Sequence, residues 1–299
     1  MHAHDGVDGR FWRAWMIAAR VPTLPAAVVP VVVGTAVAAH RGQFRPGWAL
    51  GALVVALGIQ IGTNLYNDVL DFLRGADTAS RRGPLRVTQS GLLTPKQTTA
   101  GAYVCFGIAA LVGAAFAARY GWPVLAAGGL AIAAGLGYTG GPWPLGYHGL
   151  GELFVFLFFG VLAVVGTAYV QMGTVSGLAL AASIPVGLLA TAILVVNNLR
   201  DIDSDRAVGK WTLAILLGPH RTRVLYLGCL VGAGLAPAVM RSVGEIGAWF
   251  WLPWLTVPLG AALVRTVWRP PLAAGLNRAL RETAALHLLF GMLLAASLW

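Results

Sequence analysis

The sequence has little charge for its length. Asp, Glu, Lys and Arg make up 11% of its 299 residues, whereas soluble globular proteins carry roughly 25%. Its mean hydropathy is +0.74, and several apolar stretches reach the length of about 18 residues that a bilayer-spanning helix needs. A large soluble domain is therefore excluded. The composition predicts an all-α polytopic membrane protein with a single domain over residues 1–299, in contact with the lipid bilayer.

Cysteine is also scarce. Cys105 and Cys229 both lie in apolar stretches, and neither belongs to a C-x-x-C pattern. A disulfide framework and a cysteine metal site are therefore excluded. The first residues, MHAHDGVDGRFWRAW, lack the apolar core and cleavage site of a signal peptide, so we expect the first span to be retained as an anchor.

Nine apolar stretches predict nine transmembrane helices. Placing residues 1–20 in the cytoplasm puts 17 of the 21 Lys and Arg residues on the cytoplasmic side. This bias follows the positive-inside rule, so we expect a cytoplasmic N-terminus and an odd number of spans. Topology then accounts for most of the net charge of +10, and no nucleic-acid partner is expected. The predicted spans are residues 21–39, 47–67, 98–118, 122–139, 150–171, 178–198, 222–241, 247–266 and 280–298.

Six of the eleven acidic residues fall into two short segments at the ends of predicted spans. The six are Asp68, Asp71 and Asp77 in one segment and Asp201, Asp203 and Asp205 in the other. The pattern Asn64-x-x-x-Asp68 recurs 133 residues later as Asn197-x-x-x-Asp201. Internal repeats in membrane proteins often place the ligand site at the repeat interface, so we expect both segments to face one site.

Helical spacing turns each segment into a polar stripe. Carboxylate oxygens suit a hard cation, and Mg²⁺ typically takes one or two carboxylates together with phosphate oxygens. Arginine matches phosphate bidentately, so the neighbouring basic residues favour a metal–diphosphate site over a bare cation site. The predicted metal ligands are Asn64, Asp68, Asp71, Asn197, Asp201 and Asp205, of which the four aspartates are the predicted catalytic residues. The predicted diphosphate ligands are Arg74, Arg86, Arg200 and Lys210.

Simpler interpretations compete with these roles. A single charged residue at a helix end can be a solvated loop charge, and topology alone explains any one of the arginines. The segment LGYTGGPWPLGYHGLGELF carries Tyr138, Tyr147 and Glu152. The tyrosines are either interfacial anchors or a wall of the site that stabilises a passing carbocation. Glu152 is either a helix N-terminal charge or a group that orients substrate.

Two stretches resemble a known family. NLYNDVLDFLRGAD is similar to the first aspartate-rich motif of the UbiA-type intramembrane prenyltransferases, and NNLRDIDSDRAVGKWTLAILLG is similar to the second. The resemblance covers roughly residues 20 to 298. It implies nine transmembrane helices around a central cavity, with two Mg²⁺ ions bridging both motifs to a polyprenyl diphosphate. In many members a further aspartate follows the second one of the first motif by four residues. Here that position is Gly75, which leaves the role of Asp77 open.

The resemblance also implies a reaction. RRGPLRVTQSGLLTP, GPWPLGYHGLGELFVFLFFG and DSDRAVGKWTLAILLG are most similar to members that prenylate 1,4-dihydroxy-2-naphthoate in menaquinone biosynthesis. We therefore expect Mg²⁺-dependent transfer of a polyprenyl group to this acceptor with loss of its carboxylate. The cell inner membrane is the expected location, with the site facing the cytoplasm, and no protein partner is implied. Another acceptor such as homogentisate or a chlorin, a cation transporter, and a purely structural subunit remain alternatives.

Overall fold

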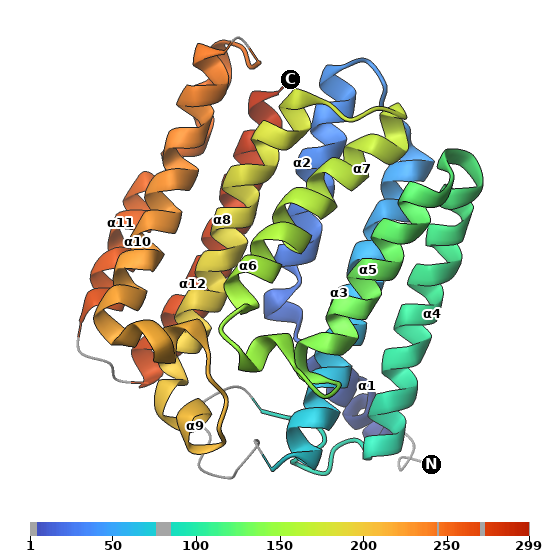
Figure 1. Cartoon of the computed structure of the whole chain (residues 1–299), viewed down its shortest axis with the longest axis vertical. Coiled ribbons are helices and arrows are strands. Elements are labelled where there is room, and N and C mark those ends of the chain that lie inside the picture. Colours follow the sequence, from blue (N-terminus) through green and yellow to red (C-terminus); the bar gives the residue numbers. More distant parts are fainter. Residues whose placement is uncertain (1–4, 76–84, 244, 270–272, 299) are drawn as a thin grey trace.

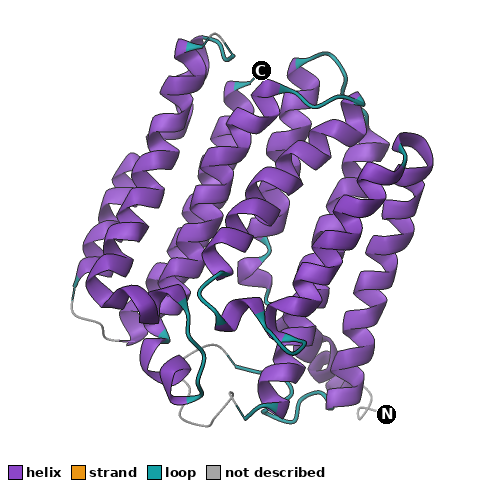
Figure 2. Cartoon of the chain, in the orientation of Figure 1, coloured by secondary structure: helices purple, strands orange, loops and turns teal. Residues whose placement is uncertain are grey.

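The described part of the chain is a bundle of helices. The computed structural model describes residues 5–75, 85–243, 245–269 and 273–298, with no strand among them (Figures 1 and 2). Asp77 lies outside these ranges. The elements in chain order are α1 (Asp5–Ala19), η1 (Val21–Thr23), α2 (Pro25–His40), α3 (Pro46–Leu73), α4 (Pro95–Tyr120), α5 (Trp122–Thr139), η2 (Leu145–Tyr147), α6 (Gly151–Val155), η3 (Phe156–Leu162), α7 (Ala163–Met172), α8 (Gly177–Arg200), α9 (Ile202–Ala207), α10 (Leu213–Ser242), η4 (Ala248–Thr256), α11 (Val257–Trp268) and α12 (Ala273–Ser297).

The predicted all-α membrane fold is confirmed. Eight described spans are long and apolar enough to cross a bilayer, and a ninth is obtained when the bent pair Phe11–Thr23 and Pro25–His40 counts as one span. In Figure 1, α1 lies at one end of the bundle and α12 ends at the other, which agrees with an odd number of crossings. The side of the membrane on which α1 lies stays a prediction.

The 56° bend between α1 and α2 has a local cause. Arg20 is the only non-glycine residue with positive φ among the described residues, at φ 54 and ψ 54. Pro22 and Pro25 follow it, and proline interrupts a helix because it lacks the backbone N–H. The predicted span 21–39 is thus a short 3₁₀ turn, η1, followed by α2.

Helix α8 lies in the middle of the bundle (Figure 1), with 67% of its most apolar window buried against 11% for α5. It packs closely against η3, a π-helical stretch. A Cβ on Gly160 would lie 2.5 Å from Cα of Gly187, so only glycine lets the two backbones approach this closely. The predicted span 150–171 is therefore α6, η3 and α7 in succession.

The two acidic segments lie on differently built helix ends. Helix α3 continues six residues beyond the predicted end of its span, so Asn64, Asp68 and Asp71 share one helix. Helix α8 instead ends at Arg200, and Asp201 has the non-helical angles φ −99 and ψ 8. Asp205 therefore lies on the separate short helix α9, although its N–H still donates to Asp201 O at 2.8 Å.

Candidate active site

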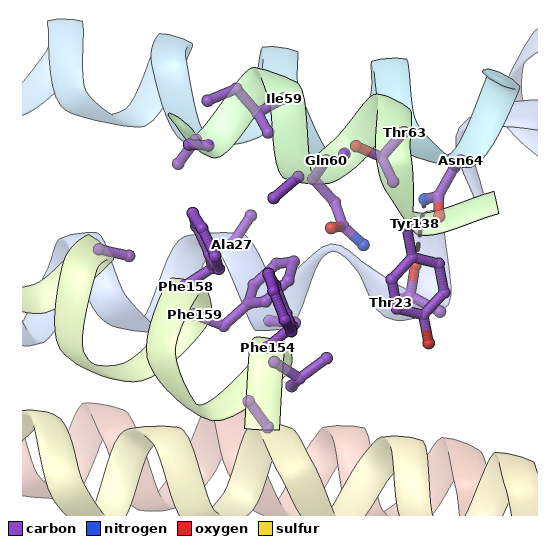
Figure 3. Close-up of a pocket in the computed structure, with 18 of the residues that line it drawn as sticks. Thr23, Ala27, Ile59, Gln60, Thr63, Asn64, Tyr138, Phe154, Phe158 and Phe159 are labelled. Atoms are coloured by element: carbon purple, nitrogen blue, oxygen red, sulfur yellow. Dashed lines mark hydrogen bonds between the residues drawn. The ribbon is translucent and has the colours of Figure 1, made fainter. Parts of the chain in front are cut away.

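A cavity of about 420 Å³ runs between α3, α5, the η3–α7 segment and α8. Its residues on α3 extend from Ala52 to Asp71, which is a rise of about 29 Å at 1.5 Å per residue. The acidic segments contribute to one end, where Asn64, Asp71 and Asp201 line it. Mostly small and apolar side chains form the remainder, with a few polar ones such as Gln60 and Thr167. The cavity therefore has a polar end and a long apolar body. Figure 3 shows a part of it near Asn64 and Tyr138.

The π-helical turn keeps one face of its span on this cavity. Residues at every fourth position line the space, namely Phe154, Phe158, Leu162, Gly166 and Val170. An α-helix has 3.6 residues per turn, so such a face would rotate away by about 40° for every four residues. The wider π turn rotates less per residue and offsets this drift. The span can therefore present a continuous wall to the cavity.

In the first acidic cluster, Asp68 and Asp71 share a cation. Arg86 Nη2 lies 2.9 Å from Asp71 Oδ2, and Arg86 Nη1 lies 3.8 Å from Asp68 Oδ2. The backbone N–H of Thr88 donates to Asp68 Oδ1 at 3.0 Å. Asn64 donates its amide N–H to Ala19 O at 3.0 Å, so its amide oxygen is the group that would hold a metal. The segment that follows α3 thus folds back over these acids.

In the second acidic cluster, the cations come from the immediate neighbours. Arg200 grips Asp201 through Nε to Oδ1 at 2.7 Å and Nη2 to Oδ2 at 2.5 Å. The same Nη2 donates to Asn197 Oδ1 at 2.8 Å. Lys210 Nζ lies 3.3 Å from Asp205 Oδ1. Here a bidentate pair and a simple ion pair each serve one acid.

Arg74 binds the connection between α5 and α6. Its guanidinium donates to Thr139 O and, at 3.2 Å, to Gly141 O, and its Cζ lies 5.3 Å from the centre of the Tyr147 ring. Lys210 approaches the same ring, with Nζ at 5.9 Å. Burial and the nearby Asp71 raise the pKa of Tyr147, so the phenol keeps its proton at neutral pH. The Tyr147 ring is therefore approached by two cations, Arg74 from the end of the first acidic segment and Lys210 from the second.

Glycines let the α5–α6 connection pack on Tyr138. A Cβ on Gly146 would lie 3.0 Å from the Tyr138 ring, and one on Gly151 would lie 2.9 Å from its hydroxyl oxygen. Tyr138 points into the cavity in Figure 3. Glu152 is buried beside α8, where Asn198 Nδ2 donates to its Oε1 at 2.9 Å. Among the described residues its other oxygen, Oε2, has no hydrogen-bond partner.

The structure brings most of the predicted site residues to one end of the cavity. Those that line it are Asn64, Asp71, Arg86, Tyr138, Tyr147, Asn197, Arg200, Asp201 and Lys210. Those that do not line it are Asp68, Arg74, Glu152 and Asp205. Asp68 and Asp205 are held by residues that do, namely Arg86 and Lys210. The roles of all these residues stay predictions.

Sequence reasoning missed three polar contributors. Asn67, which lies three residues after Asn64 on α3, lines the cavity and accepts a hydrogen bond from Thr139 Oγ1 at 2.7 Å. Asn198 fixes Glu152, and the Thr88 backbone fixes Asp68. Asparagine inside an apolar span is a visible signal, because polar groups at membrane depth need partners. A backbone N–H carries no such signal.

The donor set fits a hard divalent cation. Asp68 and Asp201 are both more than nine-tenths buried, and each carboxylate faces a cation in this structure. Buried carboxylates require such compensation, which a metal ion supplies equally well. Among the described residues, no cluster of three or more His, Cys, Asp or Glu side chains is close enough to share one ion. A metal would therefore be completed by amide and ligand oxygens.

Comparison with known sequences gives consistent matches over nearly the whole chain. Residues 27–297 match the sequence pattern described as the UbiA prenyltransferase family. The chain is 39% identical over 289 residues to the 1,4-dihydroxy-2-naphthoate octaprenyltransferase of Mycobacterium tuberculosis. This alignment covers 95% of this chain and 96% of that protein. It is 38% identical over 299 residues to the protein of that name in Escherichia coli, covering 96% of both.

Solved structures share the fold. The apo structure of a UbiA homolog from Aeropyrum pernix K1 gives a TM-score of 0.70 at 17% identity, covering 93% of this chain and 98% of that one. The structure of a UbiA homolog from Archaeoglobus fulgidus bound to GPP and Mg²⁺ gives 0.63 at 14% identity, covering 95% and 99%. The helical arrangement described above is therefore one that these proteins also adopt.

Proposed function

The chain belongs to the UbiA prenyltransferase family, and from that premise we propose that it prenylates an aromatic acceptor at the polar end of the cavity. The proposed donor is a polyprenyl diphosphate and the proposed acceptor is 1,4-dihydroxy-2-naphthoate, as in the curated relatives. The observation that carries the proposal is the joint cavity. Two acidic segments 133 residues apart in sequence contribute to one end of a long apolar space.

Charge at that end suits a diphosphate. Arg86, Arg200 and Lys210 line the cavity and offer N–H donors to phosphate oxygens. The proposed holders of Mg²⁺ are Asn64, Asp68, Asp71, Asn197, Asp201 and Asp205. Bound there, Mg²⁺ would neutralise the diphosphate and stabilise its departure as a leaving group. Arg74 is assigned to the α5–α6 connection, because it does not line the cavity and its guanidinium donates to the Thr139 and Gly141 carbonyls.

The apolar body of the cavity suits the rest of the reaction. The C–O bond to the diphosphate breaks with both electrons leaving on oxygen, and the allylic cation bonds to the ring carbon that carries the carboxylate. Loss of CO₂ returns the electron pair to the ring and gives the demethylmenaquinone skeleton. The surrounding Ala, Gly, Val and Phe side chains exclude the water that would otherwise capture the cation. The faces of Tyr138 and Tyr147 offer it electrostatic stabilisation.

The proposed location follows from charge. The bias of Lys and Arg supports a cytoplasmic location for the acidic end of the bundle, and the proposed membrane is the cell inner membrane. Helices α1 and α9 lie at that same end of the bundle (Figure 1). The proposed arrangement gives water-soluble diphosphate and acceptor access from the cytoplasm, while the prenyl tail stays in apolar surroundings.

The test is a product assay on the purified chain. Dihydroxynaphthoate, Mg²⁺ and allylic diphosphates of several lengths should give prenylated, decarboxylated product and diphosphate in equal amounts, detected by mass spectrometry. Homogentisate and a chlorin serve as competing acceptors. Preferential prenylation of either competitor would overturn the proposed acceptor, and the absence of diphosphate release with all three would overturn prenyl transfer.

A further inference from the structure

One polar side chain in the cavity has no place in the reaction described so far. Gln60 lies on α3, is 8% exposed, and lines the cavity. Figure 3 shows its amide pointing into the space between α3 and the η3 segment. Its side chain makes no hydrogen bond to any other described residue. The buried polar atoms without a partner among the described residues do not include this amide, so its atoms are open to the cavity. Polar groups in such a setting usually hydrogen-bond a partner that occupies the space. This amide is therefore directed at something that enters the cavity.

Gln60 lies where the cavity changes from polar to apolar, with Thr63 and Asn64 on one side of it and apolar residues on the other. Ala56 and Ile59 line the same part of α3, and the Phe154 and Phe158 rings lie across the cavity from it (Figure 3). Those two rings are nearly parallel, with an interplanar angle of 9° and centroids 5.7 Å apart. These stacked parallel rings form an aromatic wall, which suits an offset-stacked aromatic ligand. A prenyl chain has no polar atom and would leave the amide unsatisfied.

The position of Gln60 along α3 is where the acceptor ring is expected to lie. It lies one helical turn from Asn64, a rise of about 6 Å, on the side away from the diphosphate end. Transfer requires the acceptor carbon to lie about 3–3.5 Å from the first carbon of the prenyl group. An aromatic ring held beside the first prenyl carbon therefore has its substituents within reach of this turn. The residues deeper on α3 that line the cavity, Ala52 and Val55, are apolar.

We propose that Gln60 and the Phe154–Phe158 wall form the acceptor subsite. The amide of Gln60 hydrogen-bonds an oxygen substituent of a hydroxylated naphthoate, and the two rings pack against its bicyclic face. An amide both donates and accepts, so it serves a hydroxyl or a carboxylate. The assignment rests on the proposed function for the identity of the acceptor.

The experiment measures binding without turnover. Dihydroxynaphthoate is titrated into the purified chain in detergent with no prenyl donor, and its intrinsic fluorescence reports the Kd. Gln60→Leu and Gln60→Met should weaken acceptor binding roughly ten- to hundredfold, the usual effect of losing a buried hydrogen bond. Farnesyl diphosphate binding with Mg²⁺ should stay within about twofold of its value in the unsubstituted chain, because Gln60 lies a turn away from the acids.

Matched substitutions separate the subsite from general damage. Gln43→Leu makes the same chemical change at an exposed position and should leave acceptor binding unchanged. Phe158→Leu should weaken acceptor binding about three- to tenfold, whereas Leu157→Ala, at a 41% exposed neighbour, should not. Unchanged acceptor binding in both Gln60 variants would overturn the subsite and leave Gln60 as a water-binding residue. Loss of folding in both would overturn it as well, because the amide would then be structural.

Failure of the proposed function gives a different result. If the unsubstituted chain binds no dihydroxynaphthoate while it binds farnesyl diphosphate, the proposed acceptor is wrong. If it binds dihydroxynaphthoate and the Gln60 variants bind equally well, only the subsite is wrong. The two outcomes are read from the same titration.

Discussion

The two acidic clusters share the spacing Asn-x-x-x-Asp, but different residues pair with their carboxylates. On α3, one arginine from a following loop serves both Asp68 and Asp71, and a backbone N–H completes Asp68. At the end of α8, Asp201 is gripped by the residue beside it, and Asp205 pairs with Lys210. The first cluster thus depends on a tertiary contact, and the second is largely built from local contacts. Repeated ligand spacing does not require repeated support.

This difference between the clusters allows the effects of substitutions on catalysis to be separated from their effects on folding stability. Substituting an acid should have the same consequence for catalysis in either cluster, because both clusters belong to one metal–diphosphate site in the proposed function. Substituting a supporting cation should have unequal consequences, because Arg86 pairs with two carboxylates, the buried Asp68 and the less buried Asp71, whereas Arg200 pairs with Asp201 alone.

The largest expected effect tests the shared chemistry. Asp68→Asn and Asp201→Asn should each lower kcat by roughly 10²–10³, the cost of losing one electrostatic group at a developing charge. Asp203 is exposed and serves as the matched control, with Asp203→Asn keeping activity within about twofold. Steady-state rates with saturating donor provide the measurement. A tenfold difference between the Asp68 and Asp201 variants would break the equivalence of the clusters.

The next effect tests the unequal supports. Without ligands, Arg86→Gln should destabilise the fold by about 3–5 kcal/mol, since it removes the cation that lies beside the buried Asp68 and beside Asp71, and Arg200→Gln, which removes the cation from Asp201 alone, should cost less. Chemical unfolding in detergent gives the two values. Adding Asp68→Asn and Asp71→Asn to Arg86→Gln should recover part of the loss, because the buried charges are removed. Equal destabilisation by the two arginine variants would contradict the shared role of Arg86.

Substituting Arg74 tests whether it is a positioning residue or a diphosphate ligand. Arg74→Ala frees the carbonyls of Thr139 and Gly141 and loosens the connection that carries Tyr147. We expect kcat to fall roughly tenfold through misplacement of the cavity wall, with the donor Kd unchanged. Arg119, exposed at the C-terminal end of α4, gives the control Arg119→Ala. A donor Kd that rises as much as kcat falls would show that Arg74 binds diphosphate directly.

The smallest effect concerns the partly exposed pair of the second cluster. Lys210 and Asp205 have side chains that are 22% and 13% exposed, and their atoms lie 3.3 Å apart. Lys210→Ala should cost less than about 1 kcal/mol of stability, because solvent screens such a pair. Thermal unfolding with and without about 0.5 M salt measures the effect. At this ionic strength the Debye screening length is about 4–5 Å, so the salt should screen an exposed ion pair. A loss comparable to that of Arg86→Gln would show that this pair is as well shielded as the first cluster.

Much of the fold could be predicted because its signals are local. Apolar stretches of sufficient length mark the spans, and charge bias at their ends suggests their order across the membrane. The grouping of the two acidic segments followed from their repeated Asn-x-x-x-Asp spacing. All nine predicted spans have a counterpart among the described helices, although the first is the bent pair.

The remainder depends on three-dimensional contacts. The break at Asp201 has no proline or glycine to announce it, since NNLRDIDSD reads as a continuous helix. The π turn at Phe156–Leu162 contains Gly160, which packs closely on Gly187, and one sequence cannot reveal this pairing. Arg74 and Arg86 are equally plausible diphosphate ligands by position. Only the three-dimensional structure shows that Arg74 binds loop carbonyls, whereas Arg86 lines the cavity.

The most direct test of the central claim is whether the two clusters hold one diphosphate together. An unreactive farnesyl thiolodiphosphate is titrated into the unsubstituted chain, Asp68→Asn, Asp201→Asn and the double variant, with and without Mg²⁺. Joint action predicts that each single variant removes the Mg²⁺-dependent part of the affinity and that the double variant binds no more weakly than either, because coupled residues are non-additive. Penalties that add in the double variant would contradict it, since the clusters would then act at separate sites.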